Sequence, residues 1–374
     1  MPFASRAAQF LKPGLAEHPR LRSALRRADE TMGRLRHSAA QHVPALIRAQ
    51  PRQLTIAITA QCNLRCVGCR YGRDFMPGAR LPLDSVLLAM EDARAGGVHS
   101  VRLYGGEPLL HPDLPAMIAH GSALGLDVYV TTNGTLLERR IDELFEAGLR
   151  WLTLGFYGFD EQFDAYTQRP ALRVPFERGL VAVRERCGDE IEMQLNYVVV
   201  RPLADMATLE GAWALAQRHD MHFHLDLFGY SVPFFTKGPD DALAFRPEDA
   251  PLLARMVERL VEMMHEKPER FPHSEPFLRS VPDWVLECED MRVPCDAYEL
   301  LWIGADGTVQ LCDTAFPLGN IHERRLKDIL FGPEHQRAAR DGFQLKCPNC
   351  NCKVDSRIRK HAASWRKYSR TGDA

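Results

Sequence analysis

Cysteine is the residue type in this chain whose number and spacing most clearly indicate chemistry. Eight of the ten cysteines fall into two groups, one near each end of the chain. The first group has a Cys-x3-Cys-x2-Cys spacing, and the two groups are Cys62, Cys66 and Cys69, then Cys295, Cys312, Cys347, Cys350 and Cys352. The first twenty residues lack the continuous apolar core of a secretory signal, so we expect a cytoplasmic protein whose thiols stay reduced. Metal or cluster binding therefore explains the two groups better than disulfides do.

The three-cysteine loop favours an iron–sulfur cluster over zinc. A short loop can bring three thiolates onto one cubane and leave one iron open. A structural zinc ion prefers four ligands, and no fourth cysteine lies close to this loop in sequence. In the second group, Cys295 and Cys312 flank an expected hairpin, and Cys347 begins a Cys-x2-Cys pair. That pattern fits either a second cluster or a four-cysteine zinc ribbon.

Composition and charge exclude several other classes of protein. Hydrophobic residues make up 45% of the chain and charged residues 26%, which excludes a disordered or collagen-like chain. No apolar stretch approaches the ~18 residues that span a bilayer. The net charge of −2 hides two basic ends, with ten basic against three acidic residues in 1–52 and seven against two in 353–374. Such ends could meet a membrane surface, a nucleic acid or an acidic protein, but solvated helices are the commoner case, and we do not favour nucleic acid.

Strands alternate with helices from Leu54 onward, and this order predicts how the cysteines are positioned. We expect strands at 54–59, 100–104, 127–132, 150–157, 190–200 and 221–228, and helices at 83–95, 113–124, 138–147, 174–186 and 206–219. The alternation predicts an α/β fold with a parallel sheet and right-handed crossovers, and six strands give a partial (β/α)6 TIM-like barrel. Function in such a fold lies at the carboxyl ends of the strands, where the first cysteine loop is expected.

The segments around the barrel complete the expected organisation. We expect a basic N-terminal helical extension at 1–52, the barrel at 53–230, a bridging segment at 231–290 with one helix at 248–266, a small C-terminal α+β auxiliary domain at 291–352 and a basic tail at 353–374. A helix at 19–41 carries an apolar stripe at helical spacing, formed by Leu21, Leu25, Ala28, Met32 and Leu35. We expect the stripe to pack on the barrel, although the arginine-rich polar face keeps peripheral membrane contact open.

Three motifs stand at the ends of successive expected strands. The cysteine loop follows the first strand, Gly105-Gly106-Glu107-Pro108 ends the second and Thr132-Asn133-Gly134 ends the third. In this order they resemble the radical S-adenosylmethionine (SAM) enzymes. The resemblance implies a [4Fe-4S] cluster on the three cysteines, an open iron that binds SAM, and one-electron cleavage of SAM to a 5′-deoxyadenosyl radical. It also implies that Gly105, Gly106, Glu107 and Pro108 hold the methionine amino group, and that Asn133 belongs to the cofactor site.

Two positions differ from the pattern of that family. The residue before the third cysteine is usually aromatic, but here it is Gly68, so we expect Tyr71 to cover the adenine. Where relatives often carry Ser-Leu-Asp-Gly after the fourth strand, this chain has Gly155-Phe156-Tyr157-Gly158. Gly155 stands at the serine position and cannot make the usual serine contact, and we expect Tyr157 to lie beside the cofactor.

The second cysteine group resembles the auxiliary-cluster appendage of radical SAM enzymes, called SPASM in its long form and Twitch in its short form. The long form has two further cysteines at positions where this chain has Ser356 and Lys360, so we expect one auxiliary [4Fe-4S] cluster rather than two. The resemblance implies ligands among Cys295, Cys312, Cys347 and Cys350, with Cys352 as the open choice.

Polar side chains on the inner face of the barrel are the candidates for catalysis. Because strand side chains alternate, the apolar parity of the last two strands leaves a set of polar side chains pointing inward, namely Glu192, Gln194, Asn196, His222, His224 and Asp226. Arg201 follows the fifth strand and could bind a carboxylate or phosphate. Mutually satisfied polar packing and a divalent metal site are the alternatives for the histidines and aspartate.

Three functions remain open from the sequence. The first is a radical SAM enzyme that oxidises or epimerises a small sugar- or aminocyclitol-like metabolite, aided by the auxiliary cluster. The second keeps this chemistry but acts on a ribosomally made peptide, and the third is an iron–sulfur electron-transfer or interaction protein without SAM cleavage. Either enzyme would need an electron donor such as a flavodoxin or ferredoxin. The roughly fifty residues before the first strand are too few and too helical for the peptide-binding segment of many such relatives, which favours the small metabolite.

Overall fold

A computed structural model of the chain describes residues 19–71, 73–229, 233–235, 242–287 and 290–369, with side chains described from Thr31 onward. Cys288 and the side chains of Leu21, Leu25 and Ala28 lie outside this description. None of the helices in the described ranges is long and apolar enough to cross a membrane.

Six parallel strands form the expected barrel wall, and three more strands extend it. The six are β1 (Gln53–Thr59), β2 (Ser100–Gly105), β3 (Asp127–Thr132), β4 (Trp151–Phe156), β5 (Glu192–Val199) and β6 (His222–Leu227). Next to β1 the sheet continues with β7 (Leu300–Ile303), which is parallel to β1, and with the antiparallel strands β8 (Thr308–Gln310) and β9 (Pro317–Asn320). The sheet edges are β6 and β9, so the barrel is partial, as the sequence predicts.

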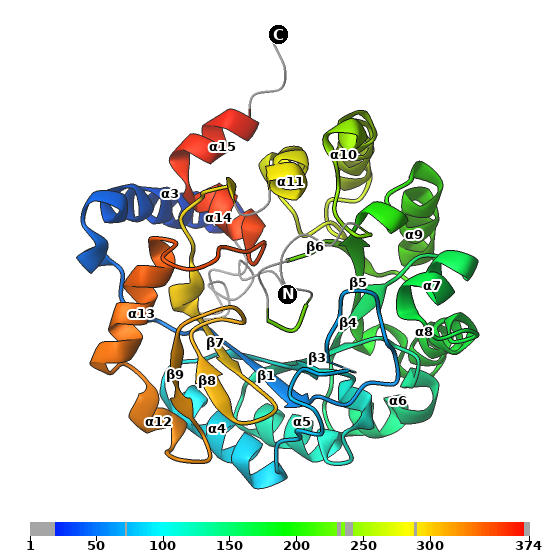
Figure 1. The fold of residues 1–374 in the computed structure, drawn as a ribbon, viewed down its shortest axis with the longest axis horizontal. Helices are drawn as coiled ribbons and strands as arrows, with labels where there is room; N and C mark the ends of the chain where they lie inside the picture. The colour runs from blue at the N-terminus through cyan, green and yellow to red at the C-terminus, as the bar shows by residue number, and fades with distance from the viewer. Residues whose placement is uncertain (1–18, 72, 230–232, 236–241, 288–289, 370–374) are drawn as a thin grey trace.

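Helices cover the outer face of this wall (Figure 1). They are α4 (Leu83–Ala95), α5 (Leu114–Ala123), α6 (Leu137–Glu146), α7 (Asp160–Thr167), α8 (Arg173–Cys187), α9 (Met206–Arg218) and α10 (Ala250–Glu266). The apolar parity of the strands packs against them, with Leu54, Leu103 and Phe223 fully buried. The sequence pattern does not predict the short α7, or α11 (Glu275–Glu287), which contains Pro282.

The side of the ring between β6 and β9 is occupied by helices from both ends of the chain (Figure 1). They are α3 (Pro19–His42), α11, α13 (Pro333–Phe343), α14 (Val354–Lys360) and α15 (Ala362–Tyr368), whereas the short α12 (Leu326–Ile329) lies against α4. The basic tail is packed rather than frayed up to Tyr368, because α14 lies against α3 and α11 and buries Arg357 and Ile358 completely.

The docking face of α3 differs from the predicted stripe. Met32 is 65% exposed and Leu35 is 61% exposed, so the prediction that these two residues pack on the protein is wrong. The opposite face is buried instead, through Ala40 and through His37, whose Nε2 lies 3.0 Å from the hydroxyl of Tyr298. A small residue and a hydrogen-bonded imidazole allow α3 to approach closely, which leaves Met32 and Leu35 in solvent.

Candidate active site: two cysteine groups around one barrel cavity

A cavity of about 2520 Å³ lies inside the ring of strands. Pockets for a single small ligand usually measure ~300–1,000 Å³, so this cavity has room for a cofactor together with a substrate. All three cysteines of the first group line it, and so does Cys352 of the second group. The two cysteine groups therefore border one shared space.

The three-cysteine loop starts where β1 ends and is held by backbone hydrogen bonds on two sides. On one side, the amides of Arg65 and Val67 donate to carbonyls at the end of α7, at 3.0 and 2.8 Å. On the other, the amide of Glu107 donates to the carbonyl of Gln61 at 2.7 Å. These contacts fix the loop at the carboxyl edge of the sheet.

Two glycines after β2 permit this close approach. A Cβ on Gly105 would collide with the backbone of Thr59, and a Cβ on Gly106 would collide with the carbonyl of Gln61. Gly105 also has φ +143°, a conformation that side chains disfavour. The double glycine is therefore required by the path of the loop that carries the cysteines.

Glu107 connects the ends of two neighbouring strands. Its buried carboxylate accepts hydrogen bonds from the Leu109 amide (2.9 Å), the Thr132 hydroxyl (2.6 Å) and the Asn133 amide (2.8 Å). Burial raises the pKa of Glu107 to about 7, although these donors oppose the rise. Gly105, Gly106 and Asn133 line the cavity, whereas Glu107 and Pro108 are buried behind it.

Asn133 extends this connection to the cysteine loop. Its Nδ2 donates to Oδ1 of Asn63 at 2.9 Å, and Asn63 follows Cys62 directly in the chain. A series of hydrogen bonds thus runs from the buried Glu107 carboxylate through Asn133 to Asn63, the residue next to the first cysteine.

The thiols of the loop fit a cluster better than a single ion. Burial raises the pKa of Cys62 to about 12, with a contribution from the Glu107 charge, and raises that of Cys66 well above its usual value, with contributions from Cys69 and Cys62. Thiols in such a place ionise when metal binds them. Within the described ranges, no group of three or more His, Cys, Asp or Glu residues converges enough to hold one metal ion. A cubane binds each thiolate through a different iron, so it suits more widely spaced cysteines.

Aromatic side chains occupy the space between the cysteine groups. Tyr71 and Tyr104 are hydrogen-bonded through their hydroxyls at 3.2 Å, and the indole of Trp302 donates to Tyr104. Cys69 and Cys350 both pack against this cluster. Tyr71 and Tyr157 both line the large cavity, and Tyr157 stacks on Tyr166 at 5.5 Å.

The inward parity of β5 and β6 agrees with the sequence pattern. Glu192, Gln194, Asn196, His224 and Asp226 all line the cavity, and Gln194 donates to Asn196 at 2.8 Å. His222 does not line it, and its ring stacks on Trp151. Because no group of three or more metal-ligating side chains converges among the described residues, a divalent metal site at His224 and Asp226 is not supported. Burial raises the pKa of Asp226, and the charge of Arg102 opposes that rise.

One cavity residue was missed from the sequence and one candidate lies elsewhere. Arg102 of β2 lines the cavity, donates to the Thr131 hydroxyl at 2.8 Å and lies 4.7 Å from the Tyr104 ring centre. The alternation of side chains along β2 could have predicted this position, because Arg102 and Tyr104 point to the same, inner side of the sheet. Arg201 does not line the cavity; its Nε pairs with Asp249 at 2.9 Å.

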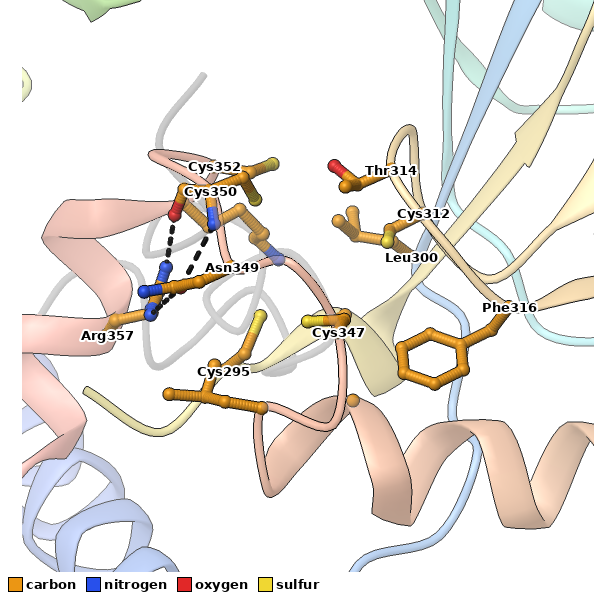
Figure 2. A pocket seen from close by; sticks show the side chains of 14 residues that line it. Cys295, Leu300, Cys312, Thr314, Phe316, Cys347, Asn349, Cys350, Cys352 and Arg357 are labelled. Carbon is orange, nitrogen blue, oxygen red and sulfur yellow. Dashed lines mark hydrogen bonds between the residues drawn. The ribbon is translucent and has the colours of Figure 1, made fainter. Parts of the chain in front are cut away.

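The second cysteine group lines a smaller cavity of its own (Figure 2). Its five cysteines are Cys295, Cys312, Cys347, Cys350 and Cys352. Burial raises the pKa of Cys295 to about 11, and the charge of Arg357 opposes this rise. Four thiolates complete a [4Fe-4S] cluster, so five cysteines here are enough for one such cluster. Cys352, together with Leu300 and Lys353, borders both cavities.

A partial α/β barrel with a three-cysteine loop after its first strand, joined to a second cysteine pocket, defines a class of cluster-dependent radical enzymes. Residues 56–205 match the family model of the Radical SAM superfamily. Residues 295–353 match that of an iron–sulfur cluster-binding domain, SPASM. The chain belongs to the radical SAM superfamily, whose members are enzymes, and its two matched domains imply a [4Fe-4S] cluster with SAM and auxiliary iron–sulfur binding.

Relatives with known names agree on the superfamily but differ in activity. A GTP 3′,8-cyclase of Chlorobaculum tepidum is 43% identical over 122 residues, which cover 30% of this chain and only 36% of the cyclase. An AdoMet-dependent heme synthase of Methanosarcina barkeri is 28% identical over 84% of this chain and 93% of the synthase. The structure of Streptococcus suis SuiB bound to its precursor peptide SuiA aligns with a TM-score of 0.59 and 16% identity, covering 81% of this chain and 70% of SuiB. This last similarity establishes the fold alone.

Proposed function

We propose that this protein cleaves SAM reductively and oxidises a small polar metabolite, of the sugar or aminocyclitol kind, with one auxiliary cluster as electron acceptor. The observation that carries the proposal is the shared cavity. Cys62, Cys66 and Cys69 border it on one side, Cys352 borders it on the other, and polar side chains form the wall of β5 and β6. Epimerisation is the alternative outcome for the same substrate radical.

The residues of the chain have distinct tasks in this proposal. When bound, the first cluster and SAM supply a 5′-deoxyadenosyl radical that takes a hydrogen atom from the substrate. Gln194 and Asn196 offer amide groups that orient substrate hydroxyls, and Arg102 offers a cation that attracts a carboxylate or phosphate. The aromatic cluster of Tyr71, Tyr104 and Trp302 excludes water beside the cysteines.

A larger substrate is the second candidate. The cavity volume of about 2520 Å³ exceeds what a sugar and SAM together require. The relative that aligns over 93% of its length is named a heme synthase, and SuiB was solved with a precursor peptide. A tetrapyrrole or a peptide therefore belongs beside sugars in any substrate screen.

Two partners are part of the proposal. An electron donor such as a flavodoxin or ferredoxin would reduce the first cluster. An anionic lipid surface would meet the exposed Met32 and Leu35 of α3, which are followed by the exposed Val43 and Leu46 in a segment rich in arginine.

Deuterium transfer tests the proposed reaction. The reconstituted protein is incubated anaerobically with SAM, reductant and one deuterated candidate at a time, namely an aminocyclitol, a sugar, a porphyrin or a peptide. The proposal expects deuterium in 5′-deoxyadenosine with an aminocyclitol or sugar. Asn196→Ala should reduce the transfer and Arg201→Ala, outside the cavity, should not. Transfer only from the porphyrin or peptide would contradict the small-metabolite proposal.

A further inference from the structure

Two histidines from distant parts of the chain form a contact in the wall of the barrel. His224 lies on β6, and His273 lies between α10 and α11. Nδ1 of His224 is 2.7 Å from Nε2 of His273, and the ring centres are 4.4 Å apart. Both residues line the cavity, although His273 is only 8% exposed.

A backbone hydrogen bond determines which nitrogen carries each proton. The amide of Leu225 donates to Nε2 of His273 at 2.9 Å, and an amide nitrogen can act only as a donor. Nε2 of His273 must therefore be unprotonated, because a proton there would face the amide hydrogen. The 2.7 Å contact then requires that Nδ1 of His224 be the donor, so both donors share one acceptor.

This assignment leaves Nε2 of His224 without a proton and with a free lone pair when the ring is neutral. No described residue forms a hydrogen bond with that nitrogen, and the side chain faces the substrate cavity. In the neighbouring strand, Asn196 stands directly beside His224 in the sheet register. An unprotonated nitrogen thus stands next to an amide that can orient a substrate hydroxyl.

The surroundings keep the pair neutral. Burial lowers the pKa of His224 well below its usual value, and His273, Arg102 and His222 lower it further, while Asp355 opposes them. Burial also lowers the pKa of His273 to about 3, with a contribution from Arg359. Neither ring is expected to carry a charge near neutral pH.

We propose that His224 is a general base for the substrate, and that His273 is the positioning residue that fixes its tautomer. This inference rests on the proposed oxidation. After a secondary alcohol loses its carbon-bound hydrogen atom to the 5′-deoxyadenosyl radical, Nε2 of His224 takes the hydroxyl proton. One electron leaves to the auxiliary cluster, the carbon–oxygen double bond forms, and the products are a ketone and 5′-deoxyadenosine.

Chemical footprinting tests the tautomer without any substrate. Diethylpyrocarbonate acylates unprotonated imidazole nitrogens, and peptide mass spectrometry of the cluster-loaded protein locates the modification. We expect His224 to react equally fast at about pH 5 and about pH 7, because its pKa lies below the ordinary imidazole range, while His273 is protected. A rate at His224 that falls about tenfold or more at the lower pH would overturn the inference.

Two substitutions of His273 distinguish a role in positioning His224 from a role in packing alone. His273→Gln places an amide oxygen near the position of Nε2 and should retain the flat pH profile of His224. His273→Leu removes the acceptor but leaves His224 buried, so the pH profile of His224 should stay flat. Without the acceptor, Nε2 carries the proton in part of the molecules, and the reaction rate at His224 should fall about twofold or more. Equal reaction rates at His224 in the Gln and Leu variants would overturn the positioning role.

Product analysis then tests the base itself, with the deuterated alcohol that transfers deuterium to the wild-type protein. His224→Gln should lower the ketone formed per 5′-deoxyadenosine by about 100-fold, a typical effect of losing a general base. His265→Gln is the control, because His265 is 65% exposed on α10, lies outside the cavity lining and should leave the ratio unchanged. An unchanged ratio in His224→Gln would overturn the base, whereas no 5′-deoxyadenosine from the wild-type protein would overturn the proposed function instead.

Discussion

Arg357 of α14 is the residue whose loss should most clearly damage the second cysteine site. Its fully buried guanidinium donates to the carbonyl of Val293 at 3.2 and 2.6 Å, to the carbonyl of Cys350 at 2.7 Å and to the side-chain oxygen of Asn349 at 3.1 Å. It also lies 4.7 Å from the ring centre of Trp284. The arginine therefore ties together the chain on both sides of the auxiliary cysteines.

The size of the effect follows from the groups left behind. Arg357→Met keeps much of the side-chain volume but leaves three buried acceptors without this donor, at about 1–3 kcal/mol each before the site relaxes. Since such losses are not additive, we expect the free energy of unfolding to fall by about 2–4 kcal/mol. The charge of Arg357 also lowers the pKa of Cys295, Cys347 and Cys350, so its removal should weaken cluster binding there.

Urea unfolding and iron analysis of anaerobically reconstituted protein measure both effects. Arg366→Met is the matched control, because Arg366 is exposed on the neighbouring α15 and should change the free energy of unfolding by no more than about 0.5 kcal/mol. A loss below about 1 kcal/mol in Arg357→Met, with full iron content, would refute the role assigned to this arginine.

Three further outcomes are expected. Leu35→Asp should leave the melting temperature unchanged and reduce sedimentation of the protein with anionic vesicles. Ala40→Asp, on the buried face of α3, should lower the free energy of unfolding by a few kcal/mol. A loss of stability in Leu35→Asp would contradict the exposed position of Leu35. Gly106→Ala should displace the backbone at Gln61 and halve the iron content of the protein. Gly33→Ala, with open space around the added Cβ, should keep the full iron content. Equal iron content in both variants would contradict the requirement for glycine beside Gln61. Iron analysis should give about eight irons per chain, and about four irons with one zinc would favour the ribbon alternative.

The barrel could be predicted because its signals are local. Alternation within each strand indicates both the strand positions and the inward parity, so the sequence alone predicts that Gln194 and His224 face the cavity, as they do. The motifs at the strand ends follow from the same order. The need for Gly106, by contrast, depends on the path of Gln61, which only the fold reveals.

Features that depend on distant contacts could not be predicted. The buried face of α3 is set by Tyr298, which lies 261 residues from His37 in sequence, so an apolar stripe alone indicated the wrong face. α11 was not predicted because Pro282 interrupts its helical sequence pattern, although its Trp284 is completely buried in the fold. The pairing of His224 with His273 likewise joins two segments that no local pattern connects.

The measurement that tests the account most directly is cleavage of SAM by the reconstituted protein. With dithionite under anaerobic conditions, we expect the wild-type protein to release 5′-deoxyadenosine, and we expect none from the variant in which Cys62, Cys66 and Cys69 are all changed to alanine. Each of these thiolates ligates the first cluster in this account, and alanine cannot replace it. A wild-type protein that carries its full iron yet forms no 5′-deoxyadenosine, or a triple variant that still forms it, would contradict the central claim.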